Sequence, residues 1–192
     1  MLEVTPYIRF VCEGGETEPN YFNGWLAAKG FKIPNAAYKP KNHSPIGIAK
    51  EAIARWKEAK SLRIPEEKVF VYAVFDRDGH DGIPDAFEML RNTPVKVLFS
   101  NVCFEFWVLL HFEKSNRAFE NCDSIVAWIR RNHDPDYAKS RDHYNRLKDR
   151  IPTAISNAKW LVENHWRYEE SRAWEKNPCT YVYEVMEETF KR

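Results

Sequence analysis

The sequence predicts an α/β protein, with a parallel sheet flanked by helices and a helical annex in its carboxyl-terminal part. Three short runs rich in β-branched and aromatic residues are apolar on both faces, as strands inside a covered sheet are. The segments between them are too long for hairpins and have helical periodicity. The three predicted strands are residues 6–12, 69–75 and 95–100.

In the first half of the chain, strands and helices alternate. A helix is expected from Pro19, ending at Gly30, because glycine commonly terminates helices. A short strand is expected over 36–40. Ser44 is placed to cap the next helix, and Pro45 suits its first turn. A further helix is expected over residues 84–92, between the second and third strands named above.

The second half of the chain has no pattern typical of a strand after Ser100. Apolar residues recur there at helical spacing. Residues 177–180 are predicted to begin the last helix, with Thr180 as a candidate cap. We expect one domain over 1–192, made of an α/β core (1–113) and a helical annex (114–192). The predicted helices of this half are 101–112, 124–132, 144–160 and 180–190.

Composition and charge set limits on function. The 192 residues are 44% hydrophobic and carry a net charge of +1, which is ordinary for a soluble protein and leaves no global electrostatic footprint of nucleic-acid binding. No run is long enough to span a bilayer, and the first residues do not resemble a signal peptide, so a cytoplasmic protein is expected. The cysteines are expected to be buried free thiols rather than zinc ligands or disulfides: Cys12, Cys103, Cys122 and Cys179.

Carboxylates follow two of the predicted strands. Strand 6–12 is followed by Glu13, Glu16 and Glu18, and strand 69–75 by Asp76 and Asp78. The carboxyl ends of parallel strands meet at one edge of a sheet, where reactive sites of open α/β sheets lie. We therefore expect these acids to crowd together.

Clustered carboxylates without a set of thiols or imidazoles favour a hard cation, Mg²⁺ or Mn²⁺. Residues two apart on an extended chain point to the same side, so Asp76 and Asp78 can share an ion. A structural alternative stays open for each motif. Asp76 could form a turn, and Glu16 and Glu18 could favour the start of the next helix through its dipole.

Taken together, these motifs resemble a known pattern. A strand ending in Glu-Gly and a later strand ending in Asp-x-Asp resemble the Toprim domain. More narrowly, the chain resembles the RloB-like family, which is associated with abortive phage infection and restriction loci. The resemblance rests on CEGGETEPNYF (12–22), VFDRDGH (74–80), SNVCFEFWVLLHFE (100–113), the YAKS segment from Tyr137 and the NPCT segment from Asn177.

The resemblance implies roles for particular residues. Glu13 would be a general acid/base or a metal ligand, Gly14 would permit the turn beneath it, and Asp76 and Asp78 would bind metal. The chain departs from the family pattern at Val102, where a proline is expected. The family motifs also include Glu16, Glu18, Ser100, Asn101, Glu105, His111 and Thr180.

Two residues of the 100–113 motif have competing interpretations. Glu105 is a candidate additional metal ligand, four residues after Asn101 on one helical face, or a helix-dipole partner. His111 lies between Leu110 and Phe112, where a hydrogen-bonded core histidine is the more common role.

The predicted function is metal-dependent cleavage of DNA or RNA in anti-phage abortive-infection defence. Among the many basic residues of the annex, Lys139 and Arg141 are the candidate nucleic-acid contacts. The alternative is a non-catalytic metal- or nucleotide-binding sensor of a defence complex. No P-loop motif occurs, so an ATP-driven step would require a partner ATPase of the AAA or ABC type. A homo-oligomer is compatible with the sequence.

Overall fold

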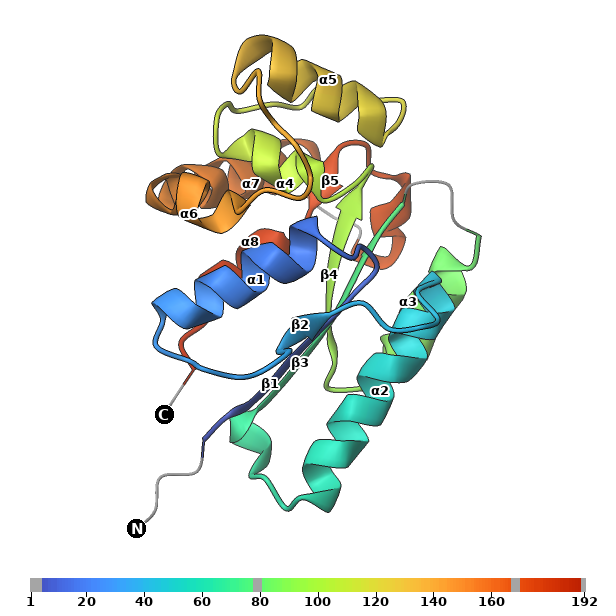
Figure 1. Cartoon of the computed structure of the whole chain (residues 1–192). Helices are drawn as coiled ribbons and strands as arrows, with labels where there is room; N and C mark the ends of the chain where they lie inside the picture. The colour runs from blue at the N-terminus through green and yellow to red at the C-terminus, as the bar shows by residue number, and fades with distance from the viewer. Residues whose placement is uncertain (1–4, 78–80, 167–169, 191–192) are drawn as a thin grey trace.

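The computed structural model describes residues 5–77, 81–166 and 170–190. A five-stranded sheet with the order β2-β1-β3-β4-β5 forms its centre (Figure 1). Strands β1 to β4 pair in parallel, and β5 pairs with β4 in the antiparallel direction. This arrangement confirms the predicted α/β class and is consistent with a Toprim-like fold. The strands are β1 (Tyr7–Cys12), β2 (Ala37–Tyr38), β3 (Val69–Asp76), β4 (Lys96–Asn101) and β5 (Cys179–Thr180).

Helices cover both faces of the sheet. In Figure 1, α2 (Pro45–Ser61) and α3 (Ile83–Leu90) lie on one face, and α1 (Thr17–Ala28) and α8 (Val182–Met186) lie on the other. Successive strand side chains alternate between these two faces. One apolar cluster therefore contains Phe10, Tyr72, Val74 and Leu98, and the other contains Val11, Ala73, Phe75 and Phe99.

Local signals set the ends of the early helices. The Ser44 side chain accepts a hydrogen bond from the Gly47 amide (3.1 Å), and Pro45 occupies the first turn of α2, as predicted. Helix α1 begins at Thr17, two residues before the predicted start at Pro19. It ends at Ala28, two residues before the predicted end at Gly30, whose φ of 84° suits glycine in the turn that follows.

The carboxyl-terminal half is mainly helical, but one of its predicted helices is divided into two. The single helix expected over 144–160 is two helices joined by a 3-10 turn at Lys148–Arg150. Pro152 lies in the first turn of the second helix, where its missing N–H and fixed φ are tolerated. The helices here are α4 (Glu105–Leu110), α5 (Cys122–Asn132), α6 (His143–Leu147) and α7 (Ile151–His165).

The prediction that no strand follows Ser100 was wrong, because β5 pairs with β4 and places Thr180 opposite Ser100. Residues 177–180 do not begin a helix, since α8 begins at Val182. Thr180 belongs to β5, although its Oγ1 accepts a hydrogen bond from the Val182 amide at 3.4 Å. Two residues are too few to show a periodic pattern in the sequence. The strand forms by pairing with the edge of β4 that would otherwise be unpaired.

The cysteine prediction was half wrong. Cys12 and Cys179 are free and buried, as expected. Cys103 and Cys122 form a disulfide with a Cα–Cα distance of 5.6 Å. They are 19 residues apart in the chain, and only the packing of α5 on α4 brings them together.

Within the described residues, no helix combines the length and apolarity that a bilayer crossing requires.

Candidate functional site

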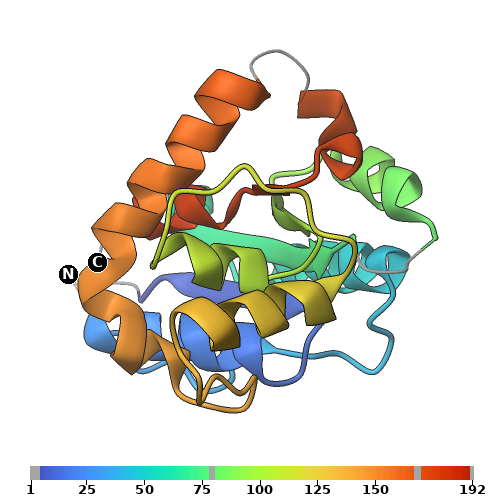
Figure 2. The same ribbon diagram turned by 90° about the horizontal axis from the view of Figure 1, so that it is seen from above.

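An acidic cleft of about 520 Å³ lies at the carboxyl ends of the parallel strands. In Figure 1 these ends point toward α4 and α5, and Figure 2 shows the same region from above. Three basic or imidazole side chains also line the cleft: Lys39, His43 and Lys139. Its five carboxylates are Glu13, Glu16, Glu18, Asp76 and Glu105.

Backbone hydrogen bonds at the strand ends place Glu13 and Asp76. The Glu13 amide donates to the Val74 carbonyl (2.9 Å), which continues the pairing of β1 with β3. Glu13 Oε2 in turn accepts from the Asp76 amide at 3.0 Å. Asp76 Oδ2 accepts from the Phe104 amide, also at 3.0 Å, just before α4. The two predicted strand ends therefore meet, as the parallel order requires.

Glu18 turns back from the first turn of α1 into the cleft, where only 5% of it is exposed. Its Oε1 accepts a hydrogen bond from the Gly14 amide at 3.1 Å. A Cβ built on Gly14 would overlap the Glu18 carboxylate, whereas one built on Gly15 would only touch Lys39 Cδ at 3.5 Å. Glycine at position 14 thus makes room for the carboxylate rather than for an unusual backbone angle.

Glu105 is the first residue of α4 and is 3% exposed. The Thr17 hydroxyl donates to Glu105 Oε1 at 3.3 Å, and the Tyr137 hydroxyl donates to the same oxygen at 3.4 Å. Lys139 Nζ lies 3.7 Å from it. Glu105 therefore has both predicted features, a position at a helix start and a place in the cleft.

Burial and neighbouring carboxylates raise the pKa values of two acids in the cleft, Asp76 and Glu18. The pKa of Asp76 lies well above its usual value because the group is buried and because Glu18, Glu13 and Glu105 repel its charge. Burial raises the pKa of Glu18 to about 7, and the charges of Glu105 and Glu13 add to this. Four carboxylates thus interact in one water-accessible cleft.

This donor set fits a hard divalent cation. Carboxylate oxygens are the ligands of Mg²⁺ and Mn²⁺, and a cation would relieve the repulsion that raises the pKa values of Asp76 and Glu18. In the part of the chain that the structure describes, the three potential ligands found within 4.8 Å of one another are Cys103, Glu105 and Cys122. No three carboxylates of the described residues come that close together, so binding an ion would require the acids to draw in around it. Asp78, the remaining predicted ligand, lies outside the described residues.

Other predicted site residues connect the end of β4 to β5 and to Trp174 instead of lining the cleft. The hydroxyls of Ser100 and Thr180 lie 3.0 Å apart and share a hydrogen bond. Asn101 Nδ2 donates to the Trp174 carbonyl at 3.0 Å. These contacts hold the end of the strand that leads to Glu105.

His111 is a core residue with 1% exposure. Its Nδ1 lies 2.9 Å from the Trp107 carbonyl, which can only accept, so Nδ1 carries the proton. Its Nε2 then accepts from the Tyr21 hydroxyl at 3.0 Å. Burial lowers the pKa of His111 to about 4, so the ring is neutral near pH 7.

The predicted nucleic-acid contacts lie in different places. Lys139 lines the cleft, and its side chain is 48% exposed. Arg141 is exposed and is not among the residues that line the cleft. Glu16 lines the cleft at the residue before α1, where its side chain makes no capping hydrogen bond.

Sequence reasoning missed several residues that line the cleft or, like Tyr137, donate a hydrogen bond to one of its carboxylates. Thr17 and Tyr137 lie inside the motifs CEGGETEPNYF and YAKS, so the motifs were the available signal. Lys39 follows a strand of only two residues, β2, and nothing in the local sequence of Cys122 indicates that it lies beside Glu105.

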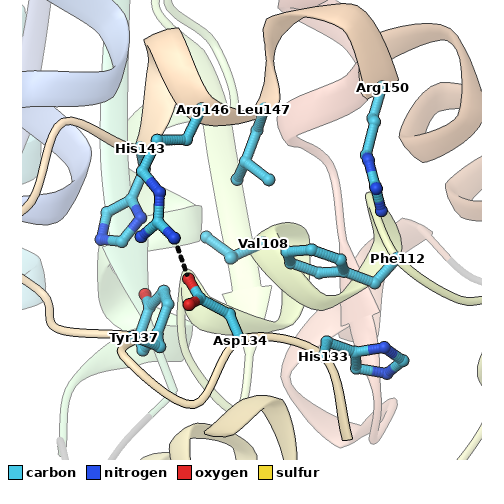
Figure 3. A pocket seen from close by; sticks show the side chains of 9 residues that line it. All are labelled: Val108, Phe112, His133, Asp134, Tyr137, His143, Arg146, Leu147 and Arg150. Atoms are coloured by element: carbon cyan, nitrogen blue, oxygen red, sulfur yellow. Dashed lines mark ion pairs between the residues drawn. The ribbon is translucent and has the colours of Figure 1, made fainter.

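A second cavity of about 210 Å³ is lined by Tyr137 and by residues of α4, α6 and the segments beside them (Figure 3). Its walls are aromatic and basic. The rings of Tyr137 and His143 stack at 4.6 Å, and Arg146 pairs with Asp134 at 2.8 Å. Arg150 lies over the Phe112 ring at 5.2 Å. Tyr137 lines this cavity, and its hydroxyl donates to Glu105, which lines the acidic cleft, so this side chain connects the two sites.

Fold and site define an α/β protein with an acidic cleft at the carboxyl edge of a parallel sheet. The family model of RloB-like proteins matches residues 8–189, and the chain therefore belongs to the RloB-like family. Searches of curated proteins and of solved structures give no significant match.

Proposed function

We propose that this RloB-like protein is a metal-dependent nuclease that hydrolyses phosphodiester bonds of DNA or RNA in abortive-infection defence. One observation carries the proposal. Glu13, Glu18, Asp76 and Glu105 come from three separate chain segments to one open cleft, where they raise the pKa values of Asp76 and Glu18. Perturbed carboxylates in a cleft are typical of catalytic sites.

Mg²⁺ or Mn²⁺ is the proposed cofactor. Asp76 and Glu13 would hold it, joined by Glu18 or Glu105 and by the sequence-predicted ligand Asp78. When bound, such an ion supplies neutralising charge for the phosphate and lowers the pKa of a water molecule.

The chain's own groups have separate tasks in this proposal. Glu13 exchanges a proton with the reacting water or the leaving oxygen, and its hydrogen bond from the Asp76 amide fixes its position for that exchange. Lys139 Nζ lies 3.7 Å from Glu105 Oε1, and the side chain is exposed enough to turn toward a phosphate. Phe104 donates its amide to Asp76 and so orients that carboxylate.

Basic residues of the acidic cleft and of the second cavity are the proposed nucleic-acid contacts. Lys39 and Lys139 line the cleft, and Arg141 lies near Lys139 in sequence. The second cavity adds Arg150 and the Asp134-paired Arg146 (Figure 3). Such contacts would position a backbone without reading its sequence.

The proposed role in phage defence rests on the family. A partner ATPase and a homo-oligomer are further proposals.

The proposal is tested by incubating a panel of DNAs and RNAs with the protein and Mg²⁺ or Mn²⁺, beside Asp76→Asn. Asparagine keeps an acceptor for the Phe104 amide but loses the charge. Asp85→Asn, an exposed position in the first turn of α3, is the matched control. Metal-dependent cleavage that Asp76→Asn abolishes and Asp85→Asn retains is the expected result.

Tight metal or nucleotide binding without turnover, even with a partner ATPase added, would contradict the nuclease and support a sensor subunit.

A further inference from the structure

The wall of the acidic cleft holds two cysteines beside a buried carboxylate. Cys103 lies two residues before the start of α4, and Cys122 is the first residue of α5. They are 2% and 4% exposed, and both line the cleft. Cys122 Sγ lies 3.0 Å from Glu105 Oε2. Sulfur and oxygen ligand atoms of these three residues lie within 4.8 Å of one another.

This donor set differs in kind from the carboxylates of the same cleft. Two sulfurs and one oxygen favour a borderline-soft cation, whereas Mg²⁺ and Mn²⁺ prefer oxygen alone. We propose that Cys103, Cys122 and Glu105 form a second metal site, selective for Zn²⁺, that becomes available when the disulfide is reduced.

The reduction step needs a dithiol reductant of the thioredoxin class. It transfers two electrons and two protons to the Cys103–Cys122 bond, giving two thiols while the reductant becomes a disulfide. Binding of Zn²⁺ then releases the two thiol protons, because thiolates are the ligands.

The backbone already suits the site. Tetrahedral zinc with bonds of about 2.3 Å to sulfur and about 2.1 Å to oxygen separates its ligand atoms by about 3.5 to 4 Å. The three ligand atoms are within 4.8 Å, and the two cysteine Cα atoms are 5.6 Å apart. Rotation of side chains is therefore enough to reach this spacing. All three residues line the cleft, so a fourth position can take water.

The positively charged Lys139 ammonium group lies beside two of the three proposed zinc ligands. Its Nζ lies 3.3 Å from Cys122 Sγ and 3.7 Å from Glu105 Oε1. Its side chain is 48% exposed, so it can leave when a metal binds. Removing its charge should tighten metal binding.

Glu105 would belong to both sites. A zinc ion held by the cysteines draws Glu105 away from the other carboxylates, so Zn²⁺ should inhibit metal-dependent cleavage after reduction. This consequence rests on the proposed nuclease function, whereas the metal site itself does not.

The test is a titration of the reduced, desalted protein with Co²⁺, a spectroscopic substitute for Zn²⁺, under anaerobic conditions. We expect about one equivalent per chain to bind with a sulfur-to-cobalt charge-transfer band, which Zn²⁺ then removes. The same protein with its disulfide intact should show no such band. Cys122→Ser and Cys103→Ser should weaken binding more than about 10-fold, and Lys139→Met should strengthen it.

Cys179→Ser is the matched control. It removes a buried thiol of β5 that does not line the cleft, and serine keeps a donor for the Ala173 carbonyl. The control should keep the band.

Absence of a sulfur-to-cobalt band in the reduced wild-type protein overturns the site. This comparison requires no substitution, so a variant that fails to fold cannot decide it. A sulfur-to-cobalt band in a protein that cleaves no nucleic acid would support the metal site and contradict only the proposed nuclease function. If Zn²⁺ does not inhibit cleavage by the reduced protein, then Glu105 does not serve both metal sites.

Discussion

Glu105 and His111 lie at the two ends of the same short helix, α4, and both are almost fully buried. His111 faces two neutral partners, the Trp107 carbonyl and the Tyr21 hydroxyl, which use both ring nitrogens. Glu105 accepts hydrogen bonds from Thr17 and Tyr137 and lies beside Lys139, but it also lines a cleft of other carboxylates. Its charge contributes to the raised pKa values of Asp76 and Glu18.

The difference separates two reasons for burying a polar group. A group with neutral, complementary partners stabilises the fold, since its hydrogen bonds replace those to water. Groups buried among like charges, as Asp76 and Glu18 are beside Glu105, cost stability until a cation or substrate binds. The Glu105 end of α4 thus has the electrostatics of a binding site, and the His111 end has those of a core.

The largest expected effect is that of Asp76→Asn at the acidic end. Cleavage should fall at least about 100-fold, because a ligand charge is lost. The free energy of unfolding of the metal-free protein should stay equal or rise, because repulsion among the acids falls. Initial rates and thermal unfolding measure the two effects. If Asp76→Asn cleaved at the wild-type rate, the acidic end of α4 would not be part of a catalytic site.

His111→Leu tests the other end. It leaves the Tyr21 hydroxyl and the Trp107 carbonyl without their partner, so the free energy of unfolding should fall by about 1–3 kcal/mol. Cleavage per folded molecule should be unchanged. Urea denaturation gives the first quantity, and rates scaled to the folded fraction give the second. A stable but inactive His111→Leu protein would show that the two ends are not distinct.

Gly14→Ala sharpens the comparison within the cleft. The added methyl would overlap the Glu18 carboxylate and displace it, so affinity for Mg²⁺ or Mn²⁺ should weaken about 10-fold. Gly15→Ala adds the same methyl where it meets only Lys39 at 3.5 Å, and should bind metal like the wild type. Isothermal titration calorimetry of both variants measures the difference. Equal affinities would mean that Glu18 does not contribute to the metal site.

The smallest expected effect is on the pH dependence of stability. The pKa of Glu18 rises from 4.5 to about 7 on folding, so the folded state binds its proton more tightly, and this group lowers stability as pH rises through that range. His111 acts oppositely, because its pKa falls from 6.5 to about 4 and stability is gained as pH rises through that window.

Mg²⁺ should therefore raise the melting temperature more at pH 8 than at pH 5, since it binds the ionised carboxylates. Glu18→Gln should reduce this difference. Thermal unfolding at both pH values, with and without Mg²⁺, provides the measurement. An Mg²⁺ effect that is the same at both values would contradict the electrostatic account of the cleft.

Much of the fold followed from local patterns. The apolar runs of β1, β3 and β4 and the Ser44-Pro45 start of α2 are signals carried by neighbouring residues. The meeting of Glu13 with Asp76 also followed, because parallel strands align their carboxyl ends. Features that depend on distant partners were missed: β5 needs the edge of β4, and the disulfide needs α5 to pack on α4.

The sequence by itself determined where strands end in carboxylates and which family motifs the chain carries, since hydrophobic periodicity and residue order are local properties. Only the tertiary structure decided that Glu105 and Cys122 lie together and that Ser100 and Thr180 bond to each other within the sheet. The core role of His111 was already the favoured interpretation of the sequence, and the structure supplied its partners. The physical reason is that burial, charge repulsion and hydrogen-bond satisfaction depend on neighbours in space, which the chain brings together only when it packs.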